Sequence, residues 1–136
     1  ITTDSTAIAV NQERLKNKLV TAIDRFSFHE LYSSEQADTL LIAYGVTARA
    51  AKAVFSKQKQ IGKPISLLVL KTLWPVPENV IQRAAQAVQR VVVVEMNLGQ
   101  YIREIKRILP GKTVDFCGQM DGQLITPARI KEAIDE

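Results

Sequence analysis

Apolar residues along the chain follow two different spacings. Several short stretches are almost continuously apolar and end at a glycine, a proline or a charged residue, which is typical of β-strands covered on both faces. We predict strands at residues 39–44, 65–70, 91–94 and 113–117, with an edge strand in the less regular aromatic segment 28–32.

Between these stretches the apolar residues recur every three or four positions, as they do on one face of an α-helix. Pro77 and the pair Thr126-Pro127 stand where helices begin, because proline suits a first turn and threonine caps it. The predicted helices cover residues 11–26, Val46 to the stop at Gly62-Lys63-Pro64, Pro77 to Val88, about 99–109, and 126 onward.

Strands that alternate with helices predict a largely parallel sheet with helices on both faces, joined by right-handed crossovers. The predicted fold is therefore a three-layer α/β sandwich. The 136 residues suit one domain, which we place at 11–136, while residues 1–10, rich in Thr and Ser, are predicted to form a linker or contact arm. Because the sequence opens on Ile1 rather than Met, we expect it to be a piece of a longer polypeptide.

The numbers of cysteine and histidine residues exclude several kinds of metal site and catalytic site. The chain has one cysteine, Cys117, and one histidine, His29, which are too few for zinc sites built from Cys and His or for cysteine-ligated iron–sulfur clusters. A catalytic triad has only His29 to use, and no nucleophile motif surrounds that residue. We interpret Cys117 as a small buried apolar side chain rather than a reactive thiol.

The charge pattern and the hydropathy of the chain bear on whether it binds nucleic acids or membranes. The 18 basic residues alternate with 14 acidic ones for a net charge of +4, a pattern that does not favour a nucleic-acid partner. No apolar run approaches the roughly 20 residues that a membrane span needs. We expect a soluble, cytoplasmic domain with no membrane partner.

The unusual residues follow three of the predicted strands. The segments are Tyr44-Gly45-Val46-Thr47, Lys71-Thr72-Leu73-Trp74-Pro75-Val76-Pro77 and Glu95-Met96-Asn97-Leu98-Gly99-Gln100. Because ligands and partners of open α/β sheets meet the carboxyl ends of the strands, we expect these segments to share one edge of the sheet.

Each segment allows two interpretations. Gly45 and Gly99 permit tight turns, or they admit a phosphate at a helix N-terminus. The sequence contains no glycine-rich nucleotide-binding motif, which disfavours a nucleotide loop. Trp74 is either a cap on the core or an anchor for a partner, with Pro75 and Pro77 stiffening its loop.

Glu95 directly follows four valines, so we expect its carboxylate to be at least partly buried. A buried charge is costly unless it is paired or hydrogen-bonded. We expect its partners to be N–H groups around residues 46–49, or the Arg49 side chain, and interpret Glu95 as a structural clamp. No second titratable group stands ready for acid–base catalysis.

These three segments resemble a known family. The strings that carry the resemblance are Ala43-Tyr44-Gly45-Val-Thr47-Ala-Arg49, Lys71-Thr-Leu-Trp-Pro75-Val-Pro77 and Val91-Val-Val-Val-Glu95-Met96-Asn97-Leu98-Gly99-Gln100. They are similar to the C-terminal region of the alpha subunit of 2-oxoacid:ferredoxin oxidoreductases, most closely the 2-oxoglutarate synthase type, within the transketolase C-terminal-domain superfamily. Gly99 is the one glycine retained of a pair that the superfamily carries after its strand glutamate.

The resemblance implies a five-stranded mixed sheet of order 1-3-2-4-5, with the segment 28–32 as an antiparallel first strand. It also implies a multisubunit enzyme that oxidatively decarboxylates a 2-oxoacid to an acyl-CoA, using thiamine diphosphate, magnesium and iron–sulfur clusters, and reduces ferredoxin. The partners implied are the rest of the alpha subunit and the thiamine-diphosphate-binding beta subunit.

None of the family's catalytic, cofactor-binding or metal-binding residues has a counterpart in this chain, so we expect the domain to be inactive alone and to serve assembly. The predicted interface or structural residues are Tyr44, Gly45, Thr47, Arg49, Trp74, Pro75, Pro77, Glu95, Asn97, Gly99 and Gln100. The alternatives are a module that binds CoA or another anion at helix N-termini, and a free-standing enzyme.

Overall fold

The computed structural model describes residues 3–136. Its elements, in chain order, are α1 (Ser5–Phe26), β1 (His29–Tyr32), β2 (Thr39–Tyr44), α2 (Thr47–Gln60), β3 (Ser66–Leu70), α3 (Glu78–Ala84), β4 (Arg90–Glu95), α4 (Gln100–Ile108), β5 (Thr113–Gly118) and α5 (Pro127–Asp135). Among the described residues, no helix combines the length and the apolar character that crossing a bilayer requires.

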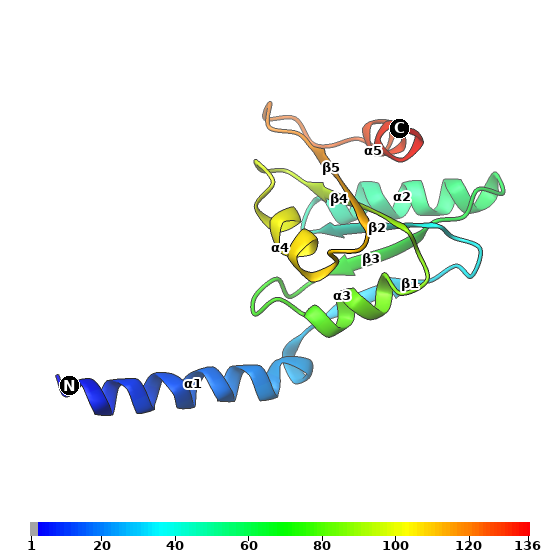
Figure 1. The fold of residues 1–136 in the computed structure, drawn as a ribbon. Helices are drawn as coiled ribbons and strands as arrows, with labels where there is room; N and C mark the ends of the chain where they lie inside the picture. The colour runs from blue at the N-terminus through cyan, green and yellow to red at the C-terminus, as the bar shows by residue number, and fades with distance from the viewer. Residues whose placement is uncertain (1–2) are drawn as a thin grey trace.

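The five strands form one mixed sheet of order β1-β3-β2-β4-β5 (Figure 1). β1 pairs antiparallel with β3, and the other three pairings are parallel. At the centre of the sheet, Ile42 lies in register with Leu68 on one side and Val93 on the other. The predicted fold class and strand order are confirmed.

Alternate residues of the central strands build two apolar layers. Leu40 and Ile42 of β2 face α3 and α4, and Leu41 and Ala43 face α2 and α5. All four side chains are fully buried, because helices cover the sheet on both faces. This arrangement explains why the strands appear in the sequence as continuous apolar runs rather than as alternating ones.

The predicted start of α5 is confirmed, whereas α3 starts one residue later than predicted. At α5, Thr126 Oγ1 accepts the backbone N–H of Arg129 at 3.2 Å, and Pro127 is the first helical residue, as predicted. Pro77 instead precedes α3 as its N-cap, with a ψ of 70° that is not helical, and α3 ends at Ala84. Val88 is buried in the turn beyond α3, so it adds to the apolar layer without extending the helix.

The N-terminal helix begins earlier than predicted. α1 starts at Ser5 because the Asp4 side chain accepts the backbone N–H of Thr6 and caps the helix. Residues 5–10 are therefore helical, and residues 1–2 lie outside the described part. α1 contains no buried residue and projects from the sandwich (Figure 1).

Candidate functional site: the strand-exit rim

Side chains from the three strand exits lie together at the carboxyl edge of the sheet, which we call the strand-exit rim (residues 44–49, 71–77 and 95–101). The Tyr44 hydroxyl donates to the Glu95 carboxylate at 2.9 Å, joining the first exit to the third. The Tyr101 hydroxyl donates to the Leu73 carbonyl at 3.4 Å, joining the third exit to the second. The rings of Tyr44 and Tyr101 pack edge to face with centroids 5.4 Å apart.

Glu95, the last residue of β4, is fully buried. Besides the Tyr44 hydroxyl, its carboxylate accepts the backbone N–H groups of Tyr101 at 2.9 Å and Ile102 at 2.8 Å. These N–H groups belong to the first turn of α4 and have no partner within that helix. Glu95 therefore caps the helix that follows it, where the helix dipole favours a negative charge.

The predicted partners of Glu95 were wrong. We expected donors at residues 46–49, but the first turn of α4 reaches the carboxylate because α4 starts only five residues after β4 ends. Arg49 instead lies exposed on α2 and has no ion-pair partner in the described part of the chain. The burial of Glu95 and its satisfaction by hydrogen bonds agree with the sequence interpretation.

Asn97 completes the cap. Its Oδ1 accepts the backbone N–H of Gly99 at 2.8 Å and of Gln100 at 3.2 Å, while its Nδ2 donates to the Tyr44 hydroxyl at 2.8 Å. The backbone of Gly99 has a φ of 81°, a left-handed conformation that glycine adopts without a steric penalty. The turn before α4 is thus fixed by the Asn97 side chain, by the left-handed backbone of Gly99, and by the bond to Tyr44 at the end of β2.

The Tyr44 hydroxyl sits between a donor, Asn97, and an acceptor, Glu95. Burial, followed by the hydrogen bond to the Glu95 carboxylate, raises the pKa of Tyr44 to about 12. Burial also raises the pKa of Tyr101 well above its usual range. Both phenols therefore remain protonated at neutral pH, as donors rather than as bases.

Thr47 fixes the start of α2. This buried residue donates its hydroxyl to the Tyr44 carbonyl at 2.8 Å, and the same oxygen lies 3.3 Å from the Val94 carbonyl. Between Tyr44 and Thr47 the chain reverses direction at Gly45, which has a φ of 58°. Gly45 thus permits the turn, and the Thr47 hydroxyl stabilises it against β4.

The second exit carries Trp74, whose side chain is 77% exposed. The interpretation of Trp74 as a core cap is therefore wrong. Pro75 is joined to it by a cis peptide bond and is half-buried, and Pro77 is buried. Beside them, Thr72 Oγ1 donates to the Phe26 carbonyl and accepts the Phe28 N–H, both at 3.0 Å, which ties the exit to the end of α1.

Each exit presents one large apolar side chain to solvent. The exposed fractions are 57% for Val46, 77% for Trp74 and 76% for Leu98. Sequence reasoning selected Trp74 and missed Val46 and Leu98, although a leucine between Asn97 and Gly99 in a tight turn is a signal of exposure. Gln100 is exposed beside Leu98.

Few side chains of the rim are free to bind a metal ion or to react. Within residues 3–136, no three His, Cys, Asp or Glu side chains gather in a way that could hold a metal ion. Both oxygens of the Glu95 carboxylate are occupied by donors from the chain itself. Cys117, on β5 outside the rim, is fully buried, and burial raises the pKa of its thiol.

Comparisons with known proteins identify the family and the fold. Residues 37–130 match the family model described as pyruvate:ferredoxin oxidoreductase core domain II. A 2-oxoglutarate synthase subunit KorA of Methanothermobacter thermautotrophicus is 30% identical over 123 residues, which are 90% of this chain and 33% of that protein. This chain therefore spans about a third of that relative's length.

Two solved structures share the fold. The 2-oxoglutarate:ferredoxin oxidoreductase from Magnetococcus marinus, with 2-oxoglutarate, coenzyme A and succinyl-CoA bound, matches with a TM-score of 0.82 and 18% identity, covering 98% of this chain and 24% of that chain. An inactive split-gene transketolase beta4 tetramer matches with a TM-score of 0.62 and 17% identity, covering 79% of this chain and 41% of that chain. The predicted likeness to a transketolase domain is confirmed at the level of fold.

Proposed function

The chain belongs to the pyruvate:ferredoxin oxidoreductase core domain II family, and from this premise we propose that it is the C-terminal structural and assembly domain of the alpha subunit of a thiamine-diphosphate-dependent 2-oxoacid:ferredoxin oxidoreductase. The relative named above makes 2-oxoglutarate the proposed substrate class and an acyl-CoA the proposed product. We propose that the domain works in the cytoplasm and docks through the strand-exit rim onto the rest of the alpha subunit and the beta subunit.

The main support for the proposal is that the one carboxylate of the rim, Glu95, is hydrogen-bonded entirely within the domain. Both carboxylate oxygens of Glu95 accept hydrogen bonds from the domain, so they are not free for a ligand. The rim exposes three large apolar residues, Val46, Trp74 and Leu98, together with the polar residues Arg49, Lys71 and Gln100. This mixture of apolar and polar groups suits a contact face, because interface anchors are enriched in tryptophan and arginine.

The cofactors of the whole enzyme do not fit this domain. Thiamine diphosphate needs magnesium held by free oxygen ligands, and the one carboxylate of the rim has none to offer. Iron–sulfur clusters need several thiolates, and the chain has the single Cys117. We propose that thiamine diphosphate, magnesium, the clusters and the ferredoxin contact all belong to other parts of the enzyme.

The N-terminus of α4 does not favour the alternative function, which is an anion-binding site at the helix N-termini. The N–H groups of Gln100, Tyr101 and Ile102, which such a site uses, already donate to Asn97 and Glu95. The N-terminus of α2 has no side-chain cap, and no further observation points to a ligand there.

Turnover and titration of the isolated chain test the proposal. We expect no reduction of a viologen dye with 2-oxoglutarate and CoA, and no heat of binding with CoA or thiamine diphosphate at micromolar concentration. The matched control is the complete oxidoreductase under the same conditions, which should turn over. Turnover by the chain alone contradicts the assembly role, and a micromolar response to CoA favours the anion-binding alternative.

A further inference from the structure

α1 is an amphipathic helix whose apolar face is uncovered from Ile8 to Leu19 and half-buried at Ala22 and Phe26. It is 22 residues long and none of its residues is buried. Ile8, Leu15 and Leu19 are 42%, 49% and 49% exposed. Because most of the stability of such a helix comes from packing its apolar face, an exposed face of this length suits a contact with another element.

The apolar face has the spacing of a helix that packs along another helix. Steps of four and three residues alternate through the stripe Ile8, Gln12, Leu15, Leu19, Ala22 and Phe26. This is the period of the two core positions in a coiled coil, with Gln12 as a polar interruption. At about 1.5 Å per residue, the stripe is about 27 Å long, which exceeds any small ligand.

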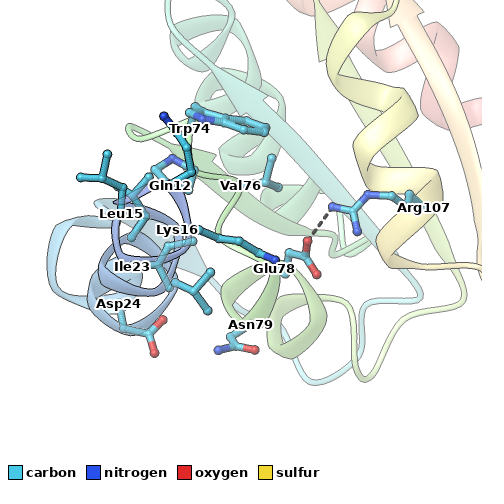
Figure 2. A pocket seen from close by; sticks show the side chains of 13 residues that line it. Gln12, Leu15, Lys16, Ile23, Asp24, Trp74, Val76, Glu78, Asn79 and Arg107 are labelled. Atoms are coloured by element: carbon cyan, nitrogen blue, oxygen red, sulfur yellow. Dashed lines mark hydrogen bonds and ion pairs between the residues drawn. The ribbon is translucent and has the colours of Figure 1, made fainter. Parts of the chain in front are cut away.

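A groove runs between this face and the second strand exit. It has a volume of about 710 Å³ and is bordered by α1, the Trp74 loop and α3. Figure 2 shows Leu15 and Ile23 of α1 on one side, with Trp74 and Val76 on the loop that faces them. The bonds from Thr72 to the Phe26 carbonyl and the Phe28 N–H hold the end of α1 to that loop, so the groove has two fixed walls at its base.

The charges beside the stripe, rather than those of the groove, indicate what packs against α1, because the groove itself is lined by both a cation, Lys16, and an anion, Asp24. The positions that flank the stripe carry Lys16, Lys18 and Arg25, and none of them has an ion-pair partner in the described part of the chain. In contrast, Arg107 at the far wall is paired with Glu78 at 2.5 Å. Packing α1 against its own copy brings cations to both flanks and no acid to either, which disfavours a homodimer through this helix.

We propose that α1 and the Trp74 loop hold one helix of the rest of the oxidoreductase, with an apolar face for the stripe and acidic residues along its edges. This inference rests on the proposed assembly function and names the contact that α1 makes within it. The relative is about three times as long as this chain, so it contains segments without a counterpart here that are candidates for the partner helix. The Magnetococcus marinus enzyme matches 98% of this chain, so nearly all of α1 has a counterpart inside a larger chain.

Photocrosslinking in the purified complete oxidoreductase tests the contact. Benzoylphenylalanine replaces Leu15 in one variant and Val10 in a matched control, because Val10 lies on the same helix but off the stripe and is 64% exposed. We expect the first variant alone to crosslink, to a peptide from another segment of the complex that carries Asp or Glu beside apolar residues. A crosslink to residues 5–26 of a second copy, or equal crosslinking at the two positions, overturns the inference.

Charge reversal tests the chemistry of the partner. We expect Lys16→Glu with Lys18→Glu to lower the affinity of the assembled complex about tenfold at low salt, with the loss shrinking at high salt. Arg14→Glu, which reverses a charge off the flanks, should leave it unchanged. An equal effect of the two changes overturns the inference.

Deletion of the whole domain separates this inference from the proposed function. If the other subunits still assemble fully without residues 3–136, the assembly function itself fails. If deletion abolishes assembly while Leu19→Glu preserves it, only the α1 contact is wrong. Since α1 buries no residue, Leu19→Glu leaves the fold of the domain intact.

Discussion

The carboxylate of Glu95 accepts the backbone N–H of Tyr101 at 2.9 Å, so the last residue of β4 caps the helix that follows it. The same oxygen accepts the hydroxyl of Tyr44 from β2. One buried side chain thereby joins two neighbouring strands to α4 and sets the shape of the strand-exit rim.

Replacing Glu95 should destabilise the domain strongly. Glu95→Ala leaves two helix N–H groups and one hydroxyl without an acceptor in a buried site, and we expect a loss of about 3 kcal/mol in the free energy of unfolding. Urea denaturation measures the change. Glu35→Ala, at an exposed position, is the control, and an equal effect of the two substitutions contradicts the capping role.

The protonation of Tyr44 should make the domain sensitive to alkali. The pKa of Tyr44 is about 12 in the folded protein, above the value of about 10 for an unfolded chain. A raised pKa gives stability that is fully present below pH 10 and is lost as pH rises towards 12.

Tyr44→Phe should therefore flatten the fall in stability between pH 10 and 12, while lowering stability at neutral pH by about 1 kcal/mol through the lost hydrogen bonds. Thermal unfolding across this pH range measures both effects. A Tyr44→Phe variant with the wild-type slope contradicts the assigned protonation.

The turn at Gly99 should accept no side chain. A Cβ at this position combines a φ of 81° with a contact of 3.3 Å to Ile102 Cγ2. We expect Gly99→Ala to destabilise the domain by about 1–2 kcal/mol in urea denaturation. Gly111→Ala, whose Cβ meets nothing within 4 Å, is the matched control and should change stability far less.

The sequence predicted the sheet well because its three central strands, β2, β3 and β4, are buried on both faces. A central strand such as 91–94 must be apolar at every position, and this requirement leaves a signal that needs no tertiary knowledge. The strand order came from the family resemblance, since local spacing does not encode which strands are neighbours.

Other features depend on contacts that local spacing does not encode. The burial of Glu95 follows from the four valines before it, but its donors come from a turn whose geometry Asn97 and Gly99 set. The start of α1 depends on the cap at Asp4 rather than on apolar periodicity. An amphipathic pattern such as that of α1 predicts a face to be covered, and it does not say whether the cover belongs to the same domain.

We propose that the strand-exit rim docks onto the rest of the enzyme and takes no part in the reaction. The direct test is native mass spectrometry of the complete oxidoreductase carrying Trp74→Ala, together with the turnover of the complexes that remain assembled. Because Trp74 is 77% exposed, we expect a folded domain, association weakened by about 2 kcal/mol, and unchanged turnover per assembled complex. Full assembly with lost turnover, or an unfolded domain, would contradict it.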